Sequence, residues 1–365
     1  MTGGYGAGSG QQDLSYIIDD NDNSFIGVTI QYRLGAFGFL SSDEVFRNGV
    51  VNAGILDQTF ALKWVQTYIH LFGGNSSQVT ISGESAGGGA VMLQTMAYGG
   101  SLGTTLFENA HASSPYLPQQ YGYADWIPTQ SYFAFASYTG CFNGTPYGFE
   151  TEYRTIFNCL LDKPTELLQN ASFYTSTVAN TGIWAFLPVT DGVFIQDRPS
   201  VQLNEKRVNG QRALIGNNAD EGAPFVPQNI TTEDDLVDWL KLTFPLFKTS
   251  DIAKVLLYYP SSNASTDYQD DQFATNGLTG ASQNNVSIVA TGQQQRASNI
   301  YAETTFVCPS YWMAQAFSDP PRQAWKYQYS VIPATHGQDV SGFFGPASPY
   351  QGPDFVSAFM RTYCL

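Results

Sequence analysis

Residues 79–90, Val-Thr-Ile-Ser-Gly-Glu-Ser-Ala-Gly-Gly-Gly-Ala, constrain the fold of this chain more than any other stretch. A short β-like run breaks there into a Gly-x-Ser-x-Gly pentapeptide and continues as small residues suited to a helix. Glycines on both sides of Ser85 let the strand and the helix approach closely, and such a tight turn exposes the serine hydroxyl. The amide of Ala86 then lies at a helix N-terminus, where the dipole favours negative charge. The pentapeptide alone is weak evidence, because a chain with 35 glycines produces chance matches.

The segments around this turn predict alternating strands and helices. Residues 24–40 are rich in β-branched and aromatic side chains and end in a glycine-punctuated cluster, a pattern typical of a buried strand. Residues 57–72 place apolar side chains near helical spacing, and two glycines end the pattern. The strand and helix of residues 79–90 follow. Crossovers of this kind build a mostly parallel sheet with helices on its faces, so we predict an α/β fold.

The remaining segments predict a single domain over residues 1–365, with no internal repeat and no linker. The glycine-rich residues 1–10 indicate a loop with several exposed amides. Residues 225–300 are polar and carry three glycosylation sequons, which favours an exposed, mainly helical insertion. Further strands are expected within 106–118, 212–217 and 325–331, and further helices within 126–168 and 355–365.

Composition and charge exclude several classes of partner. Hydrophobic residues make up 43% of the chain, which is typical of a globular protein. The formal net charge is −15 and no basic patch is visible, so binding to nucleic acid is not expected. No apolar run approaches the roughly 20 residues of a membrane-spanning helix, and the first residues lack the pattern of a signal peptide.

Other features favour an extracellular protein. Four cysteines are present, and the first two, Cys141 and Cys159, close a short loop that suits a disulfide. The alternative is that all four, with Cys308 and Cys364, are buried thiols. Six Asn-x-Ser/Thr sequons, which are used only in secreted chains, are predicted glycosylation sites: Asn75, Asn143, Asn170, Asn229, Asn263 and Asn285.

A serine hydroxyl becomes a good nucleophile only when a neighbouring base takes its proton, and histidine is the usual base. The chain has three histidines. His70 falls in the predicted helix, and His111 lies between two alanines beside a predicted strand, as a packed side chain would. His336 follows a predicted strand on a loop flanked by proline and glycine, where α/β sheets place functional groups. His336 is therefore the candidate base.

The base in turn needs a carboxylate, which lies between serine and histidine in sequence if the order is Ser, Asp/Glu, His. Asp220 and Glu221 end the predicted strand at 212–217 and meet that requirement. Asp191 also follows an apolar run, although its Asp-Gly context equally indicates a plain turn. Spacing does not separate these candidates.

These patterns together resemble the type-B carboxylesterase, cholinesterase and fungal lipase family of α/β-hydrolases. The resemblance implies Ser85 as nucleophile, His336 as base and Glu221 rather than Asp220 as the acid. The matching blocks occur in the family's order, at residues 3–5 (Gly-Gly-Tyr), 31–35 (Gln-Tyr-Arg-Leu-Gly), 52–64, 72–74 (Phe-Gly-Gly), 83–87 (Gly-Glu-Ser-Ala-Gly), 220–222 (Asp-Glu-Gly) and 336–337 (His-Gly).

The same resemblance assigns further roles. The amides of Gly3, Gly4 and Ala86 are expected to form the oxyanion hole, the set of donors that stabilises a negatively charged oxygen. Glu84 is expected to support the histidine. A buried structural ion pair between Arg33 and Asp57 is also implied. The mechanism requires no metal and no organic cofactor.

The chain also departs from the family pattern. It opens inside the oxyanion motif, so the strands that precede this motif in the family are expected to be missing, and residues 355–365 correspond to a helix cut short. Missing strands would expose the edges of their neighbours and leave Gly3 and Gly4 without the strand that fixes them.

The leading hypothesis is a serine carboxylic ester hydrolase, carboxylesterase or lipase-like, that acts through an acyl-enzyme on small-molecule or lipid esters. One alternative is a non-catalytic, esterase-like adhesion or binding protein, and another is an inactive truncated fragment. Short-chain esters, lipids and choline esters all remain open as substrates.

Overall fold

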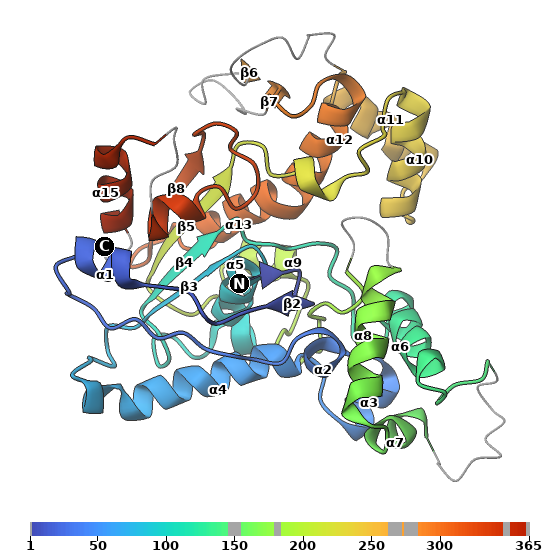
Figure 1. The fold of residues 1–365 in the computed structure, drawn as a ribbon, viewed down its shortest axis with the longest axis horizontal. Helices are drawn as coiled ribbons and strands as arrows, with labels where there is room; N and C mark the ends of the chain where they lie inside the picture. The colour runs from blue at the N-terminus through green and yellow to red at the C-terminus, as the bar shows by residue number, and fades with distance from the viewer. Residues whose placement is uncertain are drawn as a thin grey trace.

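A four-stranded parallel sheet forms the centre of the computed structural model, which describes residues 2–144, 155–178, 184–261, 272–273, 284–345 and 351–362 (Figure 1). Its spatial order is β3-β4-β5-β8, so each strand lies beside the next along the chain. The strands are β3 Thr80–Glu84, β4 Asn109–Ser113, β5 Arg212–Asn218 and β8 Gln323–Tyr329. Predicted strands at 106–118, 212–217 and 325–331 are thus confirmed.

Helices pack around this sheet and confirm the predicted α/β class. α5 Ala86–Met96 packs against β3 and β4, and α13 Cys308–Ala316 packs against β5 and β8. α9 Pro199–Asn204 contacts both of these helices. α5 is buried along nearly its whole length because its side chains are small or apolar all round. α4 Ala53–Tyr68 contacts α5 and contains most of the helix predicted at 57–72.

The other elements lie outside this centre. Figure 1 shows α10 and α11, which fall within residues 225–300, grouped away from the sheet; the single-domain assignment with an insertion there stays a prediction. The bounds of the remaining elements are β1 Thr2–Gly3, β2 Ala7–Gly8, α1 Ser15–Asp20, α2 Gly35–Phe39, α3 Asp43–Asn48, η1 Ile69–Phe72, η2 Ala97–Gly100, α6 Trp126–Tyr138, α7 Ile156–Leu161, α8 Thr165–Thr177, η3 Ala223–Phe225, α10 Glu233–Thr243, α11 Thr249–Tyr258, β6 Gln272–Phe273, β7 Asn284–Val286, α12 Gly292–Ala302, η4 Glu303–Val307, α14 Val340–Phe344 and α15 Pro353–Arg361.

The strand predicted at 24–40 is wrong. Residues 25–34 belong to no helix or strand, and residues 35–39 form the short helix α2. The physical reason is that these residues have no strand to pair with, because β3 is the edge strand of the described sheet. A cavity of about 1290 Å³ lies between β3 and residues 23–32, and residues from both sides line it. A β-rich segment forms no ladder when no backbone lies within hydrogen-bonding distance of it.

The loop predicted at residues 1–10 is also corrected. β1 and β2 pair antiparallel, with Thr2 opposite Gly8 and Gly3 opposite Ala7. Gly4 and Tyr5 form the turn with positive φ values of 54° and 65°. The ring of Tyr5 is buried and packs on Phe39 at a centroid distance of 5.0 Å, which anchors the small hairpin to the core.

The ion pair implied between Arg33 and Asp57 is present, but it is not buried. A guanidinium nitrogen of Arg33 lies 2.7 Å from an Asp57 carboxylate oxygen, and the two side chains are 56% and 28% exposed. The hydrogen bond from Arg33 holds the pKa of Asp57 below its usual value. Exposure to solvent limits what such a pair contributes to stability.

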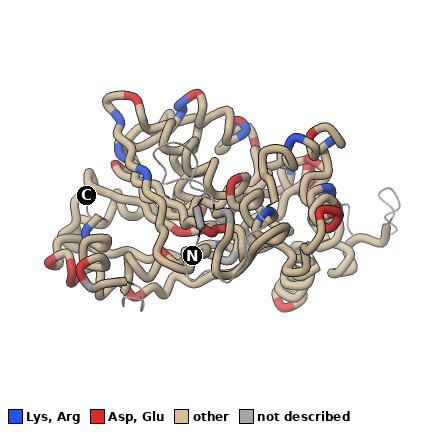
Figure 2. The backbone as a smooth tube through the Cα atoms, turned by 90° about the horizontal axis from the view of Figure 1, so that it is seen from above, with Lys and Arg blue, Asp and Glu red and all other residues tan. Residues whose placement is uncertain are grey.

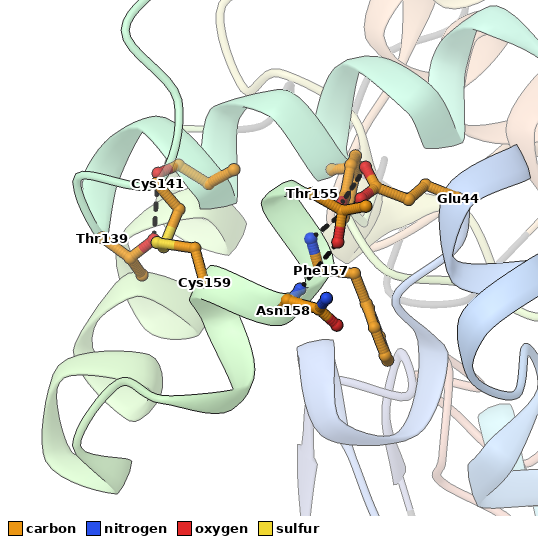
Figure 3. Close-up of a disulfide and its surroundings, with 9 residues drawn as sticks. Glu44, Thr139, Cys141, Thr155, Phe157, Asn158 and Cys159 are labelled. Carbon is orange, nitrogen blue, oxygen red and sulfur yellow. Dashed lines mark hydrogen bonds between the residues drawn. A yellow bond between two sulfur atoms is a disulfide. The ribbon is translucent and has the colours of Figure 1, made fainter. Parts of the chain in front are cut away.

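A disulfide joins Cys141, three residues beyond α6, to Cys159 on α7 (Figure 3). The alternative of four buried thiols is therefore wrong, although Cys308 is free and Cys364 lies outside the described residues. The hydroxyl of Thr155 caps α7 by accepting a hydrogen bond from the amide of Asn158, as Figure 3 shows.

Charged residues make up 13% of the chain. Acidic and basic positions are interspersed along the backbone in Figure 2. Within the described residues, no helix is both long and apolar enough to cross a membrane. Glycosylation stays a prediction: Asn263 lies outside the described residues and the side chain of Asn285 is not described, whereas the other four sequon asparagines are exposed, namely Asn75, Asn143, Asn170 and Asn229.

Candidate active site

Ser85 occupies a sharp turn between β3 and α5, as the sequence predicts. Its backbone angles, φ 57° and ψ −123°, lie outside the regions that ordinary residues favour. A Cβ built on Gly83 would lie 2.3 Å from the backbone of Gly87, so a residue larger than glycine does not fit there. The amide of Ser85 donates to the carbonyl of Ser113 at 3.0 Å, and its carbonyl accepts from Gly89 and Tyr116. These bonds hold the strained turn at the ends of β3 and β4.

A continuous hydrogen-bonded chain connects Ser85, His336 and Glu221. The Nε2 atom of His336 lies 2.8 Å from Ser85 Oγ, and its Nδ1 atom lies 2.6 Å from Glu221 Oε2. Ser85 follows β3, Glu221 follows β5 and His336 follows β8. Because parallel strands bring their carboxyl ends to one edge of the sheet, the three side chains meet although His336 lies 251 residues after Ser85.

Glu221 is the acid that the structure brings to His336. Its side chain is fully buried, at 0% exposure. The second carboxylate oxygen, Oε1, accepts hydrogen bonds of 2.5 Å from the hydroxyl of Ser114 and from the amide of Asn218. These donors satisfy Oε1 and hold Oε2 toward the imidazole.

The other candidates from the sequence lie elsewhere. Asp220 accepts a hydrogen bond from the side-chain amide of Gln295 at 3.2 Å. Asp191 accepts hydrogen bonds from three backbone amides of its own turn. His70 is exposed on η1. His111 is buried on β4, with Nδ1 3.0 Å from the hydroxyl of Ser82, and burial lowers its pKa to about 3.

Glu84 lies close to the histidine, as expected. Its Oε1 atom is 3.2 Å from His336 Nε2, so this nitrogen faces both Ser85 and Glu84. Burial raises the pKa of Glu84 to about 7, although the nearby imidazole opposes that change. Burial by itself would lower the pKa of His336, but the charges of Glu221, Glu84 and Asp339 raise it above the usual value.

Asp339 is a buried carboxyl group that the sequence reasoning missed. It accepts hydrogen bonds from the hydroxyl of Ser113, from Tyr327 Oη at 2.9 Å and from Asn218 Nδ2 at 3.2 Å. Its own amide donates to Asn218 Oδ1 at 3.2 Å. Asp339 thereby ties the loop of His336 to β4, β5 and β8. The one available signal was a polar residue three positions after His336, and its partners are recognisable only once the strand register is known.

The predicted oxyanion donors lie near the same end of α5. Ala86 is the first residue of α5, so its amide is not needed for a bond within the helix. β1, which ends at Gly3, contacts α5. The hydroxyl of Tyr5 lies against Gly89 of this helix. The hairpin that carries Gly3 and Gly4 is therefore beside the helix end that follows Ser85.

Comparisons with known proteins identify the family to which this chain is related. A sequence model of the Carboxylesterase family matches residues 1–359. The carboxylesterase patB of Penicillium expansum is 29% identical over 357 residues, covering 94% of this chain and 54% of patB. A secreted lipase of Arthroderma benhamiae is 28% identical over 347 residues, covering 93% of this chain and 59% of the lipase. The crystal structure of EstA from Aspergillus niger matches with a TM-score of 0.76 and 26% identity, covering 95% of this chain and 64% of EstA.

The similarity extends over nearly all of this chain, while the chain spans little more than half the length of the curated relatives it matches. The likeness to EstA, together with the parallel sheet flanked by helices, confirms the predicted α/β-hydrolase fold. The chain belongs to the carboxylesterase family.

Proposed function

We propose that this protein is a serine carboxylic ester hydrolase that acts through an acyl-enzyme. The observation that carries the proposal is the hydrogen-bonded chain from Ser85 Oγ through both nitrogens of His336 to the buried carboxylate of Glu221. A nucleophile bonded to a base, which is in turn bonded to an acid, is the arrangement that activates a serine hydroxyl. Ser85, His336 and Glu221 are the proposed nucleophile, base and acid.

The first half of the reaction forms the acyl-enzyme. His336 Nε2 takes the proton of Ser85 Oγ as this oxygen attacks the ester carbonyl carbon. The carbonyl oxygen becomes negatively charged, and the imidazolium of His336 then gives its proton to the departing alcohol oxygen as the ester bond breaks. Glu221 keeps Nδ1 protonated and balances the positive charge of the imidazolium through their 2.6 Å contact.

The second half hydrolyses the acyl-enzyme. His336 takes a proton from water, the resulting oxygen nucleophile attacks the acyl carbon, and the proton returns to Ser85 Oγ as the acid product leaves. The amides of Gly3, Gly4 and Ala86 are the proposed donors to the negatively charged oxygen in both halves. Each such donor typically accounts for about 10²–10³ in rate.

The proposed substrates are small-molecule or lipid esters. The support is the family, together with its relatives, which include a carboxylesterase and a secreted lipase. We also propose an extracellular location, which the Cys141–Cys159 disulfide and the secreted relative support.

Covalent labelling with a fluorophosphonate probe tests this function. The probe is expected to modify the parent protein and not Ser85→Ala, because the phosphonate reacts with an activated serine. Ser82→Ala removes a hydroxyl on β3, the strand that precedes Ser85; this hydroxyl bonds to His111 instead, and the variant is expected to keep the labelling. Equal labelling of the parent and Ser85→Ala would refute the assignment. A series of p-nitrophenyl esters of increasing acyl length then identifies the preferred substrate.

A further inference from the structure

Two phenylalanine rings pack against the imidazole of His336. The centroid of the Phe306 ring lies 4.5 Å from that of the imidazole at an interplanar angle of 39°. The Phe225 ring lies 4.9 Å away and is nearly perpendicular, at 73°. The two phenylalanine rings also contact each other, with centroids 5.4 Å apart. His336 is therefore held by two aromatic rings while its nitrogens bond to Ser85 and Glu221.

A π-helical turn places Phe306. The turn η4 joins α12 to α13, and a π turn contains one more residue than the corresponding turn of an α-helix. The carbonyl of Thr305 accepts a hydrogen bond from the amide of Leu117, which attaches the turn to the segment after β4. Phe306 is fully buried, and the ring of Tyr116 packs on it at 5.5 Å. This packing fixes the ring that faces His336.

The loop that carries Glu221 also carries Phe225. A Cβ built on Gly222 would lie 1.8 Å from the carbonyl oxygen of Ser298 on α12, so glycine is required for the loop to pass this close to the helix. The short turn η3 follows directly and ends at Phe225. The ring of Phe225 stacks on Tyr301 with centroids 5.4 Å apart at 21°. The close packing of Gly222 against α12 thus positions both Glu221 and Phe225, which contact His336.

We propose that Phe225 and Phe306 form an aromatic clamp that positions the imidazole of His336 and stabilises its protonated form. The inference rests on the proposed function, in which His336 becomes an imidazolium when it takes the proton of Ser85. The face of an aromatic ring carries negative charge and attracts a cation within about 6 Å of its centroid. Contacts with two rings also restrict rotation of the imidazole about its Cβ–Cγ bond, which keeps Nε2 toward Ser85.

The clamp differs in kind from the charged groups around His336. Three carboxyl groups face the imidazole from different elements, namely Glu84 at the end of β3, Glu221 after β5 and Asp339 just before α14. They stabilise the imidazolium by charge. The phenylalanine rings carry no net charge at any pH. Removing a ring therefore lowers the pKa of His336 without adding or removing a titratable group.

The test replaces each ring by an aliphatic side chain in Phe225→Leu and Phe306→Leu. Phe225 is only partly buried, and Phe225→Tyr keeps the aromatic ring and serves as the conservative variant. Phe317, at the end of α13, is as fully buried as Phe306. Phe317→Leu therefore controls for the general cost of losing an aromatic ring from the core. The imidazole Cε1–H signal of His336 is followed by NMR against pH and is assigned with His336→Gln.

Both Leu variants are expected to lower the pKa of His336 by about half a pH unit or more. Hydrolysis of a p-nitrophenyl ester is expected to lose about three- to tenfold in kcat, with KM changed less than about twofold. Phe225→Tyr and Phe317→Leu are expected to keep the parent pKa and kcat, even where Phe317→Leu lowers the Tm. An unchanged or raised pKa in the Leu variants would overturn the clamp.

The two proposals fail in distinguishable ways. The NMR titration needs no turnover, so it reports on the clamp even in a protein without measurable hydrolysis. A parent protein that neither hydrolyses esters nor reacts at Ser85 would refute the proposed function. Normal hydrolysis with an unchanged pKa of His336 in the Leu variants would refute the clamp alone. If Phe306→Leu does not fold, Phe225→Leu decides the outcome.

Discussion

Glu221→Gln tests whether the buried charge, rather than the shape of the side chain, supports His336. Glutamine has nearly the same shape as glutamate, so its amide oxygen can keep the hydrogen bonds from Ser114 and Asn218. Its NH₂ group would then face Nδ1 of His336, which lies 2.6 Å from the present carboxylate. Nδ1 must become an acceptor, so the imidazole proton moves to Nε2. The nitrogen that faces Ser85 then has no free lone pair to take the proton.

The expected loss is large. In serine–histidine–acid triads, an amide in place of the acid typically lowers kcat by about 10⁴, because the histidine holds the wrong tautomer. At 1.36 kcal/mol per factor of ten, this raises the activation barrier by about 5 kcal/mol. Glu221 is fully buried, so solvent does not compensate for the missing charge. We expect kcat to fall by about 10³–10⁴, with KM changed less than about threefold.

Asp220→Asn is the matched control. Asp220 is the neighbouring residue, is equally buried and bonds to Gln295 instead of His336. Steady-state hydrolysis of p-nitrophenyl acetate measures both variants, and thermal unfolding verifies that they fold. Asp220→Asn is expected to keep kcat within about tenfold of the parent. A loss of kcat in Asp220→Asn as large as in Glu221→Gln, or a Glu221→Gln variant within tenfold of the parent, would refute the role of the Glu221 charge.

Three further predictions concern charge, packing and the disulfide. Ionised Glu84 raises the pKa of His336, so Glu84→Gln is expected to lower that pKa and move the acidic limb of the kcat/KM profile to lower pH; a limb that moves upward contradicts this. Asp339→Ala leaves several buried polar groups without a partner, so the free energy of unfolding should fall by about 2–4 kcal/mol in chemical denaturation. A loss under about 1 kcal/mol would contradict a stabilising role for the hydrogen bonds to Asp339. The disulfide closes a sequence separation of 18 residues, so Cys141→Ser with Cys159→Ser should cost about 3 kcal/mol, seen as a lower Tm; an unchanged Tm would contradict it.

The candidate site was predictable from the sequence where each residue sits in a local pattern. Ser85 lies in a pentapeptide whose first glycine, Gly83, is required by the turn, and His336 follows a recognisable strand. The acid could not be identified from a local pattern in this way. Asp191, Asp220 and Glu221 all follow apolar runs, and residue spacing left them equivalent. The structure separates them because the amide of Asp220 bonds to Ala334 across the ends of β5 and β8, and the next residue, Glu221, reaches the histidine.

The fold was predictable where a segment's partners are near in sequence or supplied by the sheet. β5 and β8 formed as predicted because each has a neighbouring strand to pair with. Residues 24–40 have at least as strong a β pattern and form no strand, since they lie across a cavity from β3 instead of beside it. Strand formation depends on pairing as much as on composition. Asp339 escaped prediction for a similar reason, because its partners come from three different strands.

Two histidines of this chain show which effect decides the state of the base. His111 and His336 are both largely buried, at 4% exposure for the residue and 11% for the side chain respectively. Burial lowers the pKa of His111 to about 3, whereas the pKa of His336 is raised. The difference lies in the surroundings, since Glu221, Glu84 and Asp339 act on His336 through charge. A base must gain and return a proton in every cycle, and burial alone would leave the imidazole unable to hold one near neutral pH. If His336 is the base, as proposed, the carboxyl groups around it are what would allow a proton-transferring histidine to lie in a buried site.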